Sequence, residues 1–122
     1  MHRFGDLEAA IMDRLWERGA PTTVREILED LRPARELAYT TVLTVTDNLF
    51  KKGWLRREPD GRAHRYQPVL SREEYGARLL RDALDASGDP KLALRSFVGQ
   101  MSAAETAALR AALRGHGKGA AS

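Results

Sequence analysis

The segment from Leu37 to Tyr66 constrains the fold more than any other part of the chain. Between Ala38 and Lys52, apolar residues recur at steps of three and four, the spacing of one helical face: Val42, Val45, Leu49 and Phe50. The opposite face is polar and carries mostly short side chains: Thr40, Thr44, Asp47, Asn48 and Lys51. Two lysines and then Gly53 follow the last apolar residue, which predicts that the helix ends there.

A short hairpin is predicted directly after Gly53. Two extended segments flank Asp60-Gly61, and this dipeptide is a strong hairpin signal because glycine accepts the positive φ of a hairpin turn. Proline at each end, Pro59 and Pro68, limits the expected length of the ladder. We expect Trp54, Leu55 and Tyr66 to point inward. The exposed surface would then be lined by Arg56, Arg57, Arg62, His64 and Arg65.

Two shorter helices are predicted before this unit. Asp6 is expected to cap a helix from Leu7 to Arg18, and Thr23 with Glu26 forms a capping box for a second helix that ends near Leu31. Three helices followed by a hairpin describe a winged helix-turn-helix. The sequence therefore predicts a mainly α fold with a small β-hairpin, in which residues 1–70 form a winged helix-turn-helix domain.

Three more helices are predicted over residues 71–114, a helical dimerisation region, and residues 115–122 are expected to form a disordered tail. About 45 residues are too few to bury these apolar helix faces against one another. A second copy of the chain would cover them in a homodimer, although folding back on the winged domain of the same chain remains an alternative. The predicted dimer interface is Tyr75, Leu79, Leu80, Leu84, Leu94, Phe97, Val98, Leu109 and Leu113.

Charge is distributed unevenly along the chain, whose net charge is +3. Residues 1–48 hold six Lys or Arg against nine Asp or Glu, whereas residues 49–70 hold six against two. A local basic segment of this kind predicts a surface that binds a polyanion, double-stranded DNA in particular. The residues expected to bind phosphates or to lie in the wing are Lys51, Lys52, Arg62, His64 and Arg65.

The N-terminal half of the long helix is expected to enter the major groove as a recognition helix. The residues placed for DNA contact are Tyr39, Thr40, Thr41, Thr44 and Asn48. For Tyr39 a packing role, and for Thr41 a cap or core-edge role, are equally open. Asp47 lies on the same face and either accepts from a cytosine amino group or pairs with Lys51 at i,i+4; we favour the pairing.

Catalytic and metal-binding patterns are absent from the sequence. The three histidines are scattered, there is no cysteine, and neither a glycine-rich phosphate loop nor a Gly-x-Ser-x-Gly motif occurs. We predict that the protein is not an enzyme, needs no cofactor and binds no metal. There is also no apolar run of membrane-spanning length and no secretory signal, so we expect no membrane association and a cytoplasmic location.

Four segments together resemble the penicillinase repressor (BlaI/MecI/CopY) family of winged-helix repressors: GDLEAAIMDRLW, TVREILEDL, LAYTTVLTVTDNLFKKGWL and RAHRYQPV. The similarity covers about residues 4 to 114. It implies a homodimer that binds a palindromic operator and blocks the promoter. It also implies that the DNA-contacting positions of the recognition helix fall on Thr40, Thr41, Leu43, Thr44 and Asn48.

The resemblance also bears on the inducing signal. Members that respond to β-lactams are cut by a receptor-protease at an Asn-Phe bond, and the corresponding pair here is Ser96-Phe97. Members that respond to copper use cysteine ligands, which this chain lacks. An inducing protease or small ligand is therefore left unidentified, as are the operator sequence and the target genes.

A different class of function is also compatible with a winged helix. Such a domain can act as a protein-interaction adaptor that docks a partner protein rather than DNA. A hydrophobic outer stripe on the recognition helix would favour that alternative, whereas the small polar stripe and the basic wing favour DNA.

Overall fold

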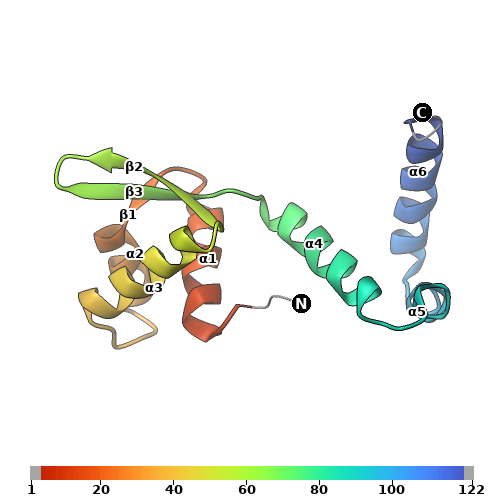
Figure 1. Cartoon of the computed structure of the whole chain (residues 1–122), viewed down its shortest axis with the longest axis horizontal. Helices are drawn as coiled ribbons and strands as arrows, with labels where there is room; N and C mark the ends of the chain where they lie inside the picture. The colour runs from red at the N-terminus through yellow and green to blue at the C-terminus, as the bar shows by residue number, and fades with distance from the viewer. Residues whose placement is uncertain (1–3, 120–122) are drawn as a thin grey trace. The chain divides into compact units, whose positions relative to one another are not determined.

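The fold was taken from a computed structural model, which describes residues 4–119. Its elements follow in the order α1 (Asp6–Arg18), β1 (Thr22–Thr23), α2 (Val24–Leu31), α3 (Tyr39–Lys51), β2 (Leu55–Asp60), β3 (Ala63–Pro68), α4 (Arg72–Asp85), α5 (Pro90–Val98) and α6 (Ala103–Gly119) (Figure 1). The chain forms two compact units, Met1–Leu80 and Arg81–Ser122, which divide within α4. The predicted fold class, mainly α with a winged helix-turn-helix, is confirmed.

One hydrophobic core holds the first unit together. Each of the first three helices contributes one apolar face, and the two long strands contribute one residue each. The buried residues are Ile11, Met12, Leu15, Val24, Ile27, Leu28, Leu31, Val42, Leu49, Leu55 and Tyr66. Leu55 and Tyr66 point inward as predicted, and Trp54 packs against this core while half-buried.

The N-terminal cap of α1 differs from the prediction. Asp6 is the first helical residue, and Gly5 is the N-cap, with an extended backbone. The backbone N–H of Gly5 donates to Oε1 of Glu8, the third helical residue, at 3.0 Å, so Glu8 satisfies the backbone donor of the N-cap. At α2 the predicted box is present: Glu26 N–H donates to Thr23 Oγ1, and Thr23 N–H donates to Glu26 Oε1.

The sheet has three strands instead of the predicted two. Their order is β1-β3-β2, both pairings are antiparallel, and β1 contributes only Thr22 opposite Tyr66 and Thr23 opposite Arg65. Thr22 is buried and its Oγ1 donates to the carbonyl of Ala20 at 2.8 Å. The short connection between α1 and α2 therefore also attaches the hairpin to the helices.

The hairpin ladder runs past Pro59, which was expected to limit it. Pairing continues through Pro59 opposite His64 and Asp60 opposite Ala63, which leaves a loop of only two residues. Gly61 occupies the first loop position with φ of 62°, a conformation that glycine adopts without strain. Pro59 fits inside the ladder because β2 is an edge strand, whose outward backbone groups need no partner.

An aromatic cluster attaches the start of α4 to the first unit. The Tyr75 ring stacks on Phe4 with centroids 4.5 Å apart, and it lies 5.3 Å from Trp54 and 5.6 Å from Trp16. Trp16 Nε1 donates to the carbonyl of Leu70 at 2.9 Å. Tyr75, which we had assigned to the dimer interface, thus packs against the winged domain of its own chain.

The second unit exposes its apolar side chains. Asp89 caps α5 with Pro90 at the first helical position, and Ser102 with Glu105 forms a capping box before α6. None of the side chains described from 81 to 116 is buried. Helix α6 continues to Gly119, into the segment 115–122 for which disorder is predicted, and residues 120–122 lie outside the described residues.

Candidate nucleic-acid interface

The outer face of α3 is exposed along its length. Every residue predicted to contact DNA there is accessible to solvent: Tyr39, Thr40, Thr41, Leu43, Thr44 and Asn48. Tyr39 and Leu43 are each 38% exposed, so two partly apolar side chains stand among hydroxyls and an amide. The face offers hydrogen-bond donors and acceptors together with methyl groups, which are the groups that read base edges in the major groove.

The inner face of α3 holds the helix in place. Val42 and Leu49 are fully buried, and so is Thr46, whose Oγ1 donates to the carbonyl of Val42 at 2.7 Å. The sequence analysis did not place Thr46 in the core because threonine is polar. Its internal hydrogen bond removes the cost of burying the hydroxyl.

The N-terminus of α3 is open. Its N-cap, Ala38, has no side-chain acceptor, in contrast to Thr23 at the start of α2. Free N–H groups at the positive end of a helix dipole favour an anion such as a phosphate. The guanidinium carbon of Arg25, on α2, lies 5.4 Å from the ring centroid of Tyr39, the first residue of α3. A cation therefore stands beside this open end.

Asp47 joins the recognition helix to the wing. Its carboxylate accepts from Lys51 Nζ at 2.9 Å, the predicted i,i+4 pair, and from Arg57 Nη1 on β2 at 3.1 Å. The guanidinium carbon of Arg57 also lies 4.0 Å from the ring centroid of Phe50. The hydrogen bond from Lys51, followed by the charges of both cations, lowers the pKa of Asp47.

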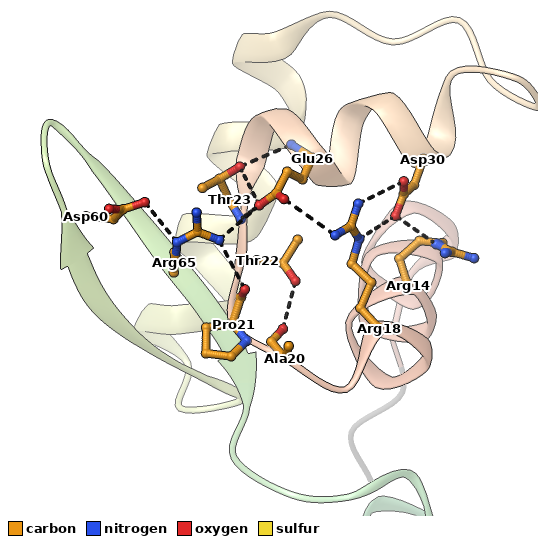
Figure 2. A network of polar contacts seen from close by, with 10 residues as sticks. All are labelled: Arg14, Arg18, Ala20, Pro21, Thr22, Thr23, Glu26, Asp30, Asp60 and Arg65. Carbon is orange, nitrogen blue, oxygen red and sulfur yellow. Dashed lines mark hydrogen bonds and ion pairs between the residues drawn. The ribbon is translucent and has the colours of Figure 1, made fainter.

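Arg65 forms ion pairs and hydrogen bonds with other residues of the first unit (Figure 2). Its Nε donates to Asp60 Oδ2 at 2.8 Å, and its Nη1 lies 3.2 Å from Glu26 Oε1 and 3.4 Å from the carbonyl of Pro21. We expected a phosphate-binding cation in the wing. The structure instead places this guanidinium, which extends from β3, between Asp60 at the end of β2, the turn before β1 and the first turn of α2.

Figure 2 also shows how the network continues into α1. Arg18 Nη1 lies 3.5 Å from Glu26 Oε2, and Arg18 Nε donates to Asp30 Oδ2 at 2.7 Å. Hydrogen bonds from the Thr23 backbone and hydroxyl are the main cause of a lowered pKa at Glu26, and the Arg18 hydrogen bond lowers the pKa of Asp30. The same Asp30 bond is the main cause that raises the pKa of Arg18.

The other predicted phosphate contacts also differ in their surroundings. Lys52 Nζ lies 3.4 Å from Glu8 Oε2, and Lys51 is held by Asp47. His64 is half-buried opposite Pro59, with a buried Nδ1 that has no hydrogen-bond partner among the described residues. Of the five predicted residues, only Arg62 at the hairpin tip is exposed with no described carboxylate within ion-pair distance.

Within residues 4–70, four further arginines are exposed and lack such a carboxylate partner among the residues that the structure describes. One lies on α2, two in the loop between α2 and α3, and one on β2: Arg25, Arg32, Arg35 and Arg56. Sequence reasoning placed Arg56 on the wing surface but missed the other three as DNA-binding candidates. The signal was present, since the loop before the recognition helix reads Arg-Pro-Ala-Arg.

The predicted dimer residues lie on three helices. Leu79, Leu84 and Leu109 are half-buried, whereas five are exposed: Leu80, Leu94, Phe97, Val98 and Leu113. Ser96 and Phe97, the pair that corresponds to the cleavage site of β-lactam-responsive relatives, are exposed within helix α5. Within residues 4–119 no cluster of three or more His, Asp or Glu residues could hold a metal ion, and no helix is long and apolar enough to cross a membrane.

Comparison with known proteins decides the family. The profile of the penicillinase repressor family matches residues 4–115. The chain belongs to this family. The transcriptional regulator BlaI of Mycobacterium tuberculosis is 49% identical, over an alignment that covers 94% of this chain and 88% of the relative. Membership confirms the resemblance noted in the sequence, and it places the chain among transcriptional repressors, which are not enzymes.

Solved structures agree on the fold of the first unit. The DNA-binding domain of the repressor BlaI is 25% identical, with a TM-score of 0.53, and the match covers 60% of this chain and 88% of that domain. The monomeric form of Bacillus licheniformis BlaI in complex with a half-operator is 24% identical, with a TM-score of 0.50, and the match covers 61% of this chain and 89% of that one.

Proposed function

We propose that this protein represses transcription by binding a palindromic operator as a homodimer, with α3 in the major groove. The observation that carries the proposal is the exposed polar face of α3, held in place by a buried inner face within a member of a repressor family. A protein-interaction adaptor would need a continuous apolar outer stripe, whereas this face carries three threonines and an asparagine around Tyr39 and Leu43. The adaptor alternative is therefore not favoured.

The cations that neutralise phosphates would lie on both sides of α3. On one side, the hairpin tip presents Arg62, with Arg56 on the neighbouring strand. On the other side, Arg25 lies beside the open N-terminus of the helix, and Arg32 and Arg35 are exposed in the loop that precedes it. Contacts of this kind supply affinity and salt dependence, whereas the threonines and Asn48 supply sequence preference.

The homodimer is supported by the second unit. A helical segment in which no described side chain from 81 to 116 is buried has not satisfied its apolar faces within one chain. Pairing with the same helices of a second copy would bury the exposed leucines, Phe97 and Val98. Two-fold symmetry would then place the two recognition helices on palindromic half-sites about one DNA turn, or a multiple of it, apart.

Gel-shift titration of genomic fragments against scrambled duplexes, repeated over a range of salt concentrations, tests the DNA-binding proposal. We expect a sequence-selective complex whose affinity falls steeply with salt. Equal affinity for all duplexes would contradict the proposal. Sedimentation of Phe97→Glu tests the dimer separately: we expect this variant to be monomeric and to bind the full palindrome more weakly. A wild-type protein that is monomeric at micromolar concentration would exclude the homodimer.

A further inference from the structure

We propose that Asp47 is a specificity-determining residue that holds two cations of the DNA-binding surface, Lys51 and Arg57, and thereby suppresses binding to DNA without the operator sequence. The inference rests on the proposed operator binding and concerns the same surface. Neither Asp47 nor Arg57 was among the DNA-binding residues predicted from the sequence.

Both carboxylate oxygens of Asp47 are paired with a cation. Oδ2 of Asp47 lies 2.9 Å from Lys51 Nζ, and Oδ1 lies 3.1 Å from Arg57 Nη1, so each oxygen holds one cation. One cation comes from the last turn of α3 and the other from β2, which places Asp47 where the recognition helix meets the wing. The Lys51 hydrogen bond lowers the pKa of Asp47, so the carboxylate stays charged at neutral pH.

The two cations are not held equally. The Lys51 side chain is 68% exposed and is bound at its tip, so it can exchange Asp47 for a phosphate by rotating its flexible stem. The Arg57 side chain is 31% exposed, and its guanidinium lies over the Phe50 ring as well as against Asp47. Both contacts direct Arg57 toward the helix and away from the solvent that DNA would occupy.

A carboxylate at this position affects the two modes of DNA binding differently. Binding to arbitrary DNA draws its free energy from neutralised phosphates, so each cation that Asp47 retains is one phosphate contact fewer. Operator binding also gains hydrogen bonds to base edges from the threonines of α3, and these do not depend on Lys51 or Arg57. Because base contacts fix the register of α3 on the operator, Lys51 and Arg57 stay on Asp47 in that complex, whereas arbitrary DNA fixes no register and would otherwise recruit both cations. Asp47 therefore lowers affinity for arbitrary DNA by a larger factor than affinity for the operator.

The near-isosteric Asp47→Asn variant tests this inference. Affinities for the operator and for a scrambled duplex are measured across salt concentrations for wild type and variant. We expect the variant to bind the scrambled duplex more tightly, with a salt slope steeper by about 2 per protomer if both released cations reach phosphates. The ratio of operator to scrambled affinity should fall.

Asp85→Asn is the matched control. It removes a carboxylate from another i,i+4 pair, with Arg81 at 2.8 Å, and changes the net charge equally, but it lies outside α3 and the wing. The inference requires an unchanged salt slope in this control. Adding Lys51→Gln and Arg57→Gln to Asp47→Asn should abolish the gain in affinity for the scrambled duplex.

Two results would overturn the inference while leaving the proposed function intact. One is a selective wild-type protein whose Asp47→Asn variant keeps the same salt slope and the same affinity ratio. The other is a variant that loses operator affinity alone, which would mean that Asp47 accepts a hydrogen bond from a base, such as a cytosine amino group. A wild-type protein without operator preference would instead contradict the proposed function itself.

Discussion

Tyr75 of α4 lies face to face with Phe4, with ring centroids 4.5 Å apart and ring planes within 9° of parallel. The contact joins residues at opposite ends of the first unit's sequence. Trp16 and Trp54 surround the same ring, so four of the chain's eight aromatic residues gather at this place. The start of α4 is thereby part of the winged domain.

Replacing Tyr75 by alanine should lower the free energy of unfolding by about 2 kcal/mol, because the ring contributes both buried area and aromatic contacts. Chemical denaturation at fixed protein concentration measures this. Tyr75→Phe retains the ring and should lose far less. If Tyr75→Ala shifted the dimer equilibrium without changing the stability of the protomer, Tyr75 would belong to the subunit interface after all.

Arg62 and Arg65 should respond differently to alanine, although both were predicted to bind phosphates. Arg62→Ala should weaken binding to every duplex and reduce the salt slope by about 0.9 per protomer, with stability unchanged within about 0.5 kcal/mol. Arg65→Ala should instead cost about 1 kcal/mol of stability, because Asp60 and Glu26 lose their shared partner. Salt titrations and denaturation of both variants separate the two roles.

Acid should destabilise the winged domain partly through Glu26. Its pKa in the folded protein is lowered from the ordinary 4.5, so its contribution is present above that value and is lost as pH falls through the lowered pKa. Thermal unfolding from pH 7 to pH 3 should therefore show a flatter acid limb for Glu26→Gln. Glu29→Gln, at an exposed glutamate on the same helix, is the control for the loss of one carboxylate.

Thr44 and Thr46 lie two residues apart on opposite faces of α3. Substitutions at the two positions should separate effects on DNA sequence preference from effects on stability. Thr44→Val should alter preference among operator variants by roughly tenfold at the contacted base while leaving stability and salt slope unchanged. Thr46→Ala should lower stability by about 1 to 2 kcal/mol, because it leaves a small cavity in the core. Identical binding profiles for Thr44→Val and wild type would remove Thr44 from the readout.

Sequence reasoning succeeded where local rules decide the structure. The capping box of Thr23 and Glu26 and the spacing of Val42 and Leu49 each depend on residues within one or two turns. The Asp47 pair with Lys51 is local in the same sense. For these features, the residues that determine the conformation stand next to one another in the chain.

It did not anticipate contacts between residues that are distant in the sequence. Strand β1 has two residues and no periodicity, and it exists because Thr22 and Thr23 meet β3. The sequence predicts Arg65 as an exposed cation of the wing, whereas in the fold its guanidinium pairs with Glu26, 39 residues away. No spacing rule predicts either meeting, because both require the tertiary structure.

Strand β1 has a mechanical consequence. Thr23 pairs with Arg65 of β3 and is also the N-cap of α2. A displacement of the wing is therefore transmitted through one residue to α2, and Arg57 transmits it to α3. Wing and reading helix should move on DNA as one rigid body, so tolerance to altered half-site spacing has to originate outside the first unit.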